Sequence, residues 1–243
     1  MLRNLYQRGI YIKGLTKRNS DPNPRGPQEE AMVVKNRALG LLAALGLSGM
    51  MVAVGCQSKP PRVPPPTIDP SEAGTAAIDE YDTDGDEGLS HEELAKCPAI
   101  LSAMELYDQN RDGKVNADEI ADRIRSWQAQ SIGVTSFYCK VLMDGQPLDG
   151  AVVKLVPETF LGDAVKPATG LSGRTGLAVL AIAADDLPDD QKRLRGIHVG
   201  LFKVEVTHPS VTIPARYNTA TILGQETAGD SPNGQYIVYE LTH

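Results

Sequence analysis

The sequence predicts a multidomain protein in which a small all-α module precedes an all-β sandwich. Two acidic segments between residues 79 and 122 are flanked by apolar residues at helical spacing, which favours short helices beside each segment. After Trp127 the pattern changes to short alternating apolar runs separated by Gly, Pro and Asp, as in a sandwich of antiparallel strands. The 243 residues include 23 Gly and 17 Pro, so small domains joined by linkers are expected.

The N-terminal region has the layout of an export signal. Residues 35–37 carry two positive charges and precede residues 38–54, an uncharged apolar run of 17 residues. The residues at the end of this run, Ala53-Val54-Gly55-Cys56, resemble the lipobox of bacterial lipoproteins. That resemblance implies cleavage before Cys56 and acylation of the cysteine, which then anchors the chain to a membrane. A retained transmembrane anchor is the alternative, and either one places the rest of the chain outside the cytoplasm.

The predicted start is Met32, because a secretory signal peptide has a short basic region before its apolar run. Five prolines after Cys56 predict an extended polyproline II tether, which rises about 3.1 Å per residue. The predicted boundaries are residues 1–31 for a mis-assigned start or disordered extension, 32–55 for the signal peptide, 56–68 for the tether, 69–130 for the helical pair and 134–243 for the sandwich.

Composition excludes several functional classes. From residue 56 onward, 16 basic and 28 acidic side chains leave a net charge of −12, which argues against nucleic acid as a partner. Three cysteines without a Cys-x-x-Cys pair exclude zinc-finger and thioredoxin-type sites. The sequence also lacks a Gly-x-Ser-x-Gly elbow, a His-Glu-x-x-His motif and a phosphate-binding glycine loop, so we expect no enzyme activity.

Oxygen-bearing residues recur at fixed spacing in residues 108–119, the second loop. Calcium takes six to eight oxygen ligands, which alternating short side chains and one longer glutamate supply in a tight loop. Gly113 stands at position 6, where the chain needs a positive φ, and Val115 at position 8 can pair with a neighbouring loop. The expected ligands at positions 1, 3, 5, 7, 9 and 12 are Asp108, Asn110, Asp112, Lys114 through its carbonyl, Asn116 and Glu119.

Residues 82–93, the first loop, repeat this pattern 26 residues earlier. Glu87 stands at position 6 in place of Gly, and a positive φ at a residue with a β-carbon costs about 1 kcal/mol. We therefore expect a weakened or distorted first site, with Gly88 absorbing part of the bend. The expected ligands are Asp82, Asp84, Asp86, Gly88 through its carbonyl, Ser90 and Glu93.

The two loops together resemble an EF-hand pair, which implies Ca²⁺ as the bound ion. Ile78 and Tyr81 precede the first loop as Met104 and Tyr107 precede the second, and Pro98 predicts one short helix through about Lys96 and another beginning near the proline. The short repeat also resembles dockerin modules, which implies calcium-dependent binding to a protein receptor as the alternative. An Asp-rich turn region that binds no metal is the simplest alternative of all.

The C-terminal half is predicted to consist of strands. Residues 135–143 end in the turn Asp144-Gly145, with residues 151–156 as the expected partner strand. Residues 183–198, rich in Asp, are expected to form a long solvated loop. The other predicted strands are residues 177–182, 201–207 and 236–241, with shorter candidates near Val211 and Thr221.

Three motifs in this half resemble the transthyretin-like, carboxypeptidase regulatory-like sandwich of bacterial surface lipoproteins. They are residues 144–153, Ser172-Gly173-Arg174-Thr175-Gly176-Leu177-Ala178 and Gly200-Leu201-Phe202-Lys203-Val204-Glu205-Val206. The resemblance implies that the first motif closes a hairpin between strands one and two. It also implies a non-catalytic binding or accessory domain.

The functional prediction is a calcium-binding, membrane-anchored lipoprotein whose sandwich contacts a protein or a cell-surface polymer. A less favoured alternative is a secreted enzyme subunit that binds polysaccharide through aromatic residues such as Tyr217. His198 and His208 are expected to be ordinary, partly exposed side chains. Outside the cytoplasm the compartment is oxidising, which permits a disulfide between Cys97 and Cys139. The sequence leaves open whether the two cysteines pair.

Overall fold

The computed structural model describes residues 63–231 and 235–243, which belong to one compact unit. The predicted signal peptide, the lipidation site Cys56 and the first part of the tether lie outside the described residues. Among the described helices, none combines the length and the apolar character needed to cross a membrane.

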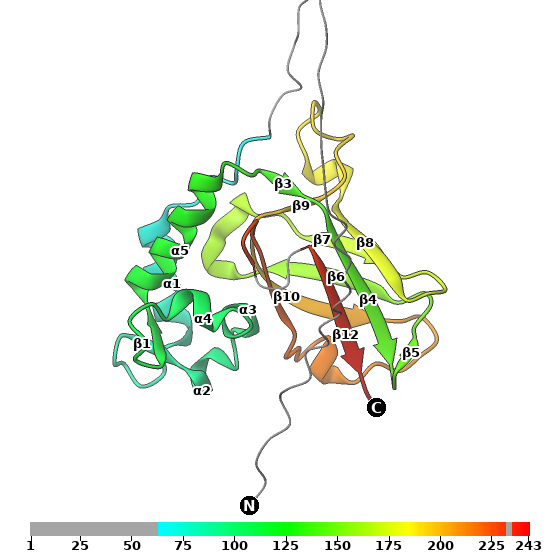
Figure 1. The fold of residues 1–243 in the computed structure, drawn as a ribbon, viewed down its shortest axis with the longest axis horizontal. Coiled ribbons are helices and arrows are strands. Elements are labelled where there is room, and N and C mark those ends of the chain that lie inside the picture. The colour runs from blue at the N-terminus through cyan, green and yellow to red at the C-terminus, as the bar shows by residue number, and fades with distance from the viewer. Residues whose placement is uncertain (1–62, 232–234) are drawn as a thin grey trace, which may run out of the picture. The chain divides into compact units, whose positions relative to one another are not determined.

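Five helices and a small two-stranded sheet form the first part of the described chain (Figure 1). Asp69 caps the first helix by accepting hydrogen bonds from the backbone N–H groups of Ser71 (2.9 Å) and Glu72 (3.0 Å). Pro98 begins a short helix as predicted, because a helix can begin but not continue at proline. The elements are α1 (Pro70–Tyr81), β1 (Gly88–Ser90), α2 (His91–Leu94), α3 (Pro98–Leu101), α4 (Met104–Tyr107), β2 (Lys114–Asn116) and α5 (Ala117–Gln130).

The end of the predicted tether is packed rather than extended into solvent. Ile68 is buried, and its carbonyl accepts a hydrogen bond from Nε2 of Gln128 at 2.7 Å. The backbone of Val63 and Pro64 lies against Gly133, where a β-carbon would have no room. Residues 63–68 are therefore not a free spacer, because Ile68 is held by Gln128 of α5 and the backbone of Val63 and Pro64 contacts Gly133.

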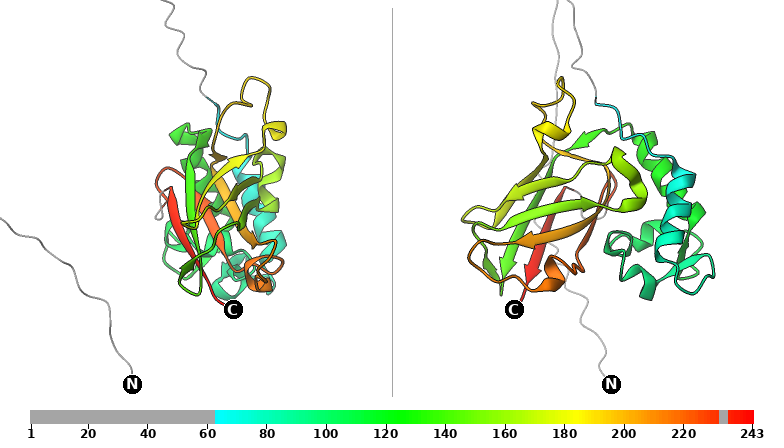
Figure 2. Two further views of the ribbon diagram at one scale, coloured as in Figure 1. Left: turned by 90° about the vertical axis from the view of Figure 1, so that its right-hand side faces the viewer. Right: turned by 180° about the vertical axis from the view of Figure 1, so that it is seen from behind.

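The second part is β-rich and is built around one curled sheet of eight strands (Figures 1 and 2). Its order is β11-β10-β6-β7-β8-β4-β12, and β5 pairs with β4 beside this path. All neighbours are antiparallel except β12 and β4, which run parallel. The strands are β4 (Phe137–Met143), β5 (Gln146–Pro147), β6 (Val152–Pro157), β7 (Ala168–Leu171), β8 (Leu177–Ile182), β10 (Gly200–Thr207), β11 (Gly224–Thr227) and β12 (Tyr236–Leu241).

The β-rich prediction is confirmed, and residues 177–182 and 236–241 match β8 and β12 residue for residue. The strands follow one hydrogen-bonded path, with β7 and β8 sharing only two residue pairs where the sheet bends. This arrangement is compatible with a sandwich, in which two halves of a sheet face each other across a core. Three 3₁₀ helices, η1 (Thr159–Ala164), η2 (Ala184–Asp186) and η3 (Ala215–Tyr217), lie in its connections.

Several predictions of individual strands were wrong. The turn at Asp144 and Gly145 leads only into the two-residue β5, whereas β6 pairs with β7 and β10 and not with β4. Gly150, with φ at 82°, redirects the chain after β5 and donates a hydrogen bond to the Ser172 carbonyl at 2.9 Å. The candidates near Val211 and Thr221 are irregular, and the true strands β7 and β11 were missed because neither carries an apolar alternation.

The helices and the sheet share one cluster of buried hydrophobic residues. Helix α3 packs on β11 and β10, and a β-carbon added at Gly224 of β11 would meet the backbone of Pro98 and Ala99. Cys97, next to α3, and Cys139, in β4, are both buried and free, so no disulfide joins them. Contacts between α3 and the sheet hold the two parts together instead.

Residues 183–198 form a largely exposed loop, as expected, but its end is anchored. Leu187 is buried, and β9 (Ile197–His198) pairs with β3 (Val134–Thr135). His198 is therefore buried and not partly exposed. Its Nδ1 accepts a hydrogen bond from the backbone N–H of Lys166 at 3.1 Å, so this nitrogen carries no proton.

Acid is expected to destabilise the protein through His198. Burial, followed by the charge of Lys166, lowers the pKa of His198 in the folded state. The unfolded chain then binds more protons below its own histidine pKa of about 6.5, so the contribution of His198 to stability is complete above that pH and is lost as the pH falls. When the pH falls from 7 to 5, urea unfolding should show a smaller loss of stability for His198→Asn than for the wild type, with the exposed His91→Asn as control. An equal loss in all three proteins would contradict this role.

Candidate metal centre

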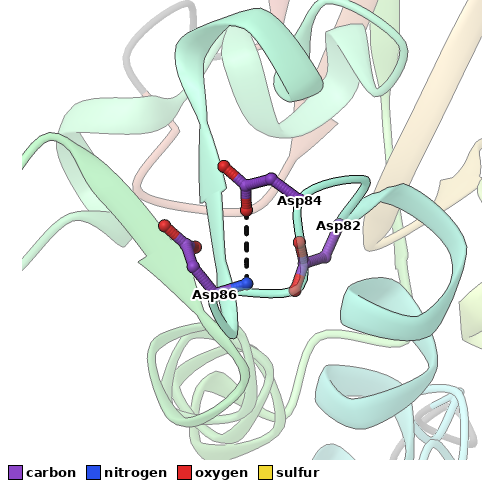
Figure 3. A group of neighbouring side chains, drawn as sticks. All are labelled: Asp82, Asp84 and Asp86. Atoms are coloured by element: carbon purple, nitrogen blue, oxygen red, sulfur yellow. Dashed lines mark hydrogen bonds between the residues drawn. The ribbon is translucent and has the colours of Figure 1, made fainter.

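Three carboxylates of the first loop meet between α1 and β1 (Figure 3). Asp82, Asp84 and Asp86 each offer an oxygen atom, and these atoms lie within 4.8 Å of one another. Asp82 is half-buried and the other two are exposed. Oxygen atoms this close, on alternate residues of one turn, can hold a metal ion.

Each loop contains the same set of hydrogen bonds from its backbone N–H groups to its own side chains, at the same loop positions. The N–H at position 6 donates to the carboxylate at position 1, from Glu87 to Asp82 (2.9 Å) and from Gly113 to Asp108 (3.0 Å). The N–H at position 5 donates to the side chain at position 3, and the N–H at position 7 donates to the carboxylate at position 5, in both loops. The two segments therefore have the same local fold, although they differ at position 6.

The glutamate at position 12 folds back over each loop. In the first loop Glu93 accepts hydrogen bonds from the N–H groups of Thr83 (2.6 Å) and Ser90 (2.9 Å). Hydrogen bonds from the Ser90 and Thr83 backbones lower the pKa of Glu93 to about 2. In the second loop Glu119 accepts from the backbones of Gln109 (3.1 Å) and Asn116 (3.0 Å). Both glutamates thus turn a carboxylate toward the start of their own loop.

A short antiparallel ladder joins the loops, as the sequence predicted. Leu89 of β1 pairs with Val115 of β2, and both side chains are fully buried. Lys114 in β2 forms an ion pair with Asp86 of the first loop. A side chain of one loop therefore neutralises an expected ligand of the other.

Backbone strain is equal in the two loops. Positions 4 and 6 have positive φ in both: Gly85 at 76° and Glu87 at 67° in the first loop, Arg111 at 62° and Gly113 at 86° in the second. Each loop thus has one glycine and one residue with a β-carbon in this conformation. A distortion of the first loop relative to the second is therefore not seen, because Gly85 relieves the first loop at position 4 while Arg111 carries the same cost in the second; a weaker first site stays a prediction. Gly88 does not absorb the bend, since it lies in β1.

Glycine at either strained position is expected to stabilise the protein. Glu87→Gly and Arg111→Gly each remove a left-handed residue with a β-carbon, which costs about 1–2 kcal/mol, partly offset by the greater freedom of glycine in the unfolded chain. Each variant should therefore gain up to about 1 kcal/mol in urea unfolding. Gln109→Gly, at the second position of the second loop, is the control and should lose stability. A loss in all three variants would contradict equal strain.

The tyrosine before the second loop is tied to the sheet through a buried carboxylate. Glu226 of β11 is 1% exposed and accepts a hydrogen bond from the Tyr107 hydroxyl at 3.1 Å. Arg123 of α5 donates to both oxygens of Glu226, at 2.7 and 2.8 Å, and also to Asp230 at 2.9 and 3.0 Å. Trp127 of α5 adds an indole N–H at 3.1 Å. The helices on both sides of the second loop thus bind one carboxylate of the sheet.

The tyrosine before the first loop has an equivalent contact. Tyr81, the last residue of α1, donates a hydrogen bond to Glu158 at 2.9 Å, and Lys203 of β10 lies 3.3 Å from the same carboxylate. Burial raises the pKa of Glu158 and opposes the effect of Lys203, which lowers it. Both loops are therefore preceded by a tyrosine whose hydroxyl group reaches a buried glutamate of the β-rich region.

The sequence did not reveal these contacts. Tyr81 and Tyr107 were recognised only as matching apolar positions of the repeat. Arg123 occupies the apolar face of α5 between Ile120 and Trp127, and a lone arginine on such a face is the one signal that pointed to a buried acidic partner. Of the twelve predicted ligands, Asp82, Asp84 and Asp86 form a carboxylate cluster among the described residues, whereas Cys56 lies outside them.

Comparison with known proteins assigns no family to this chain. No model of a protein family matches the chain, and no curated protein matches it either. The chemistry of the loops is therefore inferred from the positions and contacts of their own residues.

Proposed function

We propose that this protein is an extracytoplasmic calcium-binding lipoprotein, in which a pair of EF-hand-like loops supports a non-catalytic β-rich region that contacts a partner. The observation that carries the proposal is the common hydrogen-bond set of the two loops, from position 1 to position 12. Two segments of different sequence that adopt one strained conformation are best explained by a shared ligand.

Calcium is the ion that fits the donor set best. The first loop offers four carboxylates, and the second offers three carboxylates and two asparagines. All of these donors are hard oxygen atoms, and the described loops contain no Cys and no His at a ligand position, so soft transition metals are disfavoured. Extracellular calcium modules bind with dissociation constants of about 10⁻⁴ to 10⁻³ M, which suits a structural ion in calcium-rich surroundings.

The proposal is tested by calorimetric titration of calcium into the chelator-treated protein and four variants. Glu93→Gln and Glu119→Gln remove the carboxylate at position 12 of each loop, and each should weaken its own site at least tenfold while leaving the other intact. Glu92→Gln and Asp118→Asn change the exposed neighbouring carboxylates at position 11 and are the matched controls. An equal loss of calcium affinity in the control variants would mean that binding depends only on the overall negative charge of the loops.

The proposed location rests on the sequence before the described residues. Residues 35–56 have the basic, apolar and cysteine parts of a lipoprotein signal. Acylation should leave the mature chain in the membrane fraction of the producing bacterium, and Cys56→Ala should release it or leave it unprocessed. Recovery of the wild-type chain in the soluble fraction without an acyl mass would contradict the proposal.

A further inference from the structure

One face of the curled sheet gathers most of the exposed apolar side chains. Eight large hydrophobic residues are exposed in the described chain, and six of them lie on β7, β8, β4 and β12. The exposed fractions range from 38% to 66%. We call these six the apolar face: Tyr138, Leu171, Leu177, Val179, Tyr236 and Val238.

Strand register places these side chains in adjoining rows. Val179, Tyr138 and Tyr236 are paired across β8, β4 and β12, and Leu171 follows on the same side of β7. Leu177 and Val238 flank Lys140 in the next row. The inward residues between them, such as Cys139 and Leu180, are buried in the core. The strands therefore have an apolar inside and an apolar outside, whereas a sheet with one solvated face has polar residues outside.

The size of the apolar face suits association. The largest apolar patch on a typical monomer covers roughly 300–600 Å² and is often functional. Six side chains that are 38% to 66% exposed form a patch of that order, and residues around it would supply the rest of the roughly 800 Å² that each partner of a standard interface buries. Two such faces packed together at the usual spacing of about 10 Å form a sandwich between two copies.

Charge also favours a second copy on this face. The net charge of −12 after residue 55 is concentrated in the two loops, whereas the apolar face contains only Lys140, with Glu240 of β12 at its rim. Helix α3, which lies between the two loops, packs on β11 and β10, whereas the apolar face lies on β7, β8, β4 and β12. Pairing through β4, β8 and β12 therefore brings together surfaces that carry few charged side chains, whereas the acidic remainder of the chain repels an anionic membrane surface.

We propose that the apolar face is a self-association surface, through which two copies of this chain pack β8, β4 and β12 against each other. The proposal does not depend on calcium, since none of these strands contributes to the loops. Tyr236 and Val179 lie on different strands, in the row that also contains Tyr138, and serve as independent test positions. Ile222, which is 60% exposed and lies outside the apolar face, is the matched control.

Sedimentation equilibrium of residues 57–243, which hold the whole described core, tests this proposal, with the full-length chain measured in parallel. The wild type should show a monomer–dimer equilibrium in the presence of chelator. Tyr236→Lys and Val179→Lys should each weaken it by about tenfold or more, as expected for central interface residues, whereas Ile222→Lys should change it less than twofold. Circular dichroism and unaltered calcium binding establish that the variants are folded.

Three results would overturn the proposal. The first is a wild type that sediments as a monomer at all concentrations. The second is a dimer that both lysine variants retain, which would assign self-association to another surface. A monomer that binds neutral phosphatidylcholine vesicles, with binding lost in Tyr236→Lys, would assign the face to a lipid surface instead.

Discussion

Arg123→Ala is expected to lose about 3–5 kcal/mol of free energy of unfolding, because removal of one partner leaves the buried carboxylate of Glu226 without its counter-charge. Arg123 is 6% exposed, and its guanidinium makes two hydrogen bonds to Glu226 and two to Asp230. Burial alone would lower the pKa of Arg123, but its bonds to Glu226 and Asp230 raise it, so the group is charged at every accessible pH. Urea unfolding at pH 7 measures the loss.

Arg125→Ala is the matched control on the same helix. Arg125 pairs with Asp122 at 2.6 Å, but both side chains are about half exposed, so its loss should stay below about 1 kcal/mol. Glu226→Ala should lose at least as much as Arg123→Ala, since Tyr107, Trp127 and Ser231 also donate to that carboxylate. Similar small losses for Arg123 and Arg125 would show that the contact between α5 and β11 contributes little.

Calcium is expected to raise the free energy of unfolding by about 2.7 kcal/mol for each loop when its concentration is 100 times the dissociation constant. Between residues 79 and 122, 14 carboxylates face only three basic side chains, so a bound cation also relieves repulsion. Unfolding in calcium and in chelator measures the difference. Glu119→Gln should remove about half of the gain.

The calcium effect should extend beyond the loops. Tyr107 precedes the second loop and Arg123 follows it, and both hold Glu226 of β11. Amide hydrogen exchange in β11 should therefore slow when calcium binds, and Tyr107→Phe should reduce that response while leaving calcium affinity nearly unchanged. Protection confined to residues 82–119 would mean that the loops and the sheet are energetically independent.

The local features of the chain were the most predictable. The spacing of Asp, Asn and Glu identified both loops, and Pro98 marked the start of α3, because these features depend on neighbours in the sequence. Strands with strong apolar alternation, such as β8 and β12, were also found. The short strand β11, with the sequence Gly-Gln-Glu-Thr, exists only because it pairs with β10, which no local pattern reveals.

Contacts between distant segments explain the other differences. Glu158 and Glu226 are ordinary acidic residues in the sequence, and their burial depends on Tyr81, Tyr107 and Arg123, which lie far away along the chain. The strain at Glu87 was predicted correctly, since its φ is 67°. The matching strain at Arg111 becomes visible only when the two backbones are compared.

Equilibrium dialysis of the wild-type protein against calcium, with the bound metal counted by elemental analysis, is the most direct test of the central claim. A millimolar background of magnesium displaces calcium that is held only by the general negative charge of the acidic surface. Binding should saturate at two calcium ions per chain in the wild type, and at one in Glu93→Gln or Glu119→Gln. A wild-type chain that retains no calcium at millimolar concentration would contradict the claim that the two loops are calcium sites.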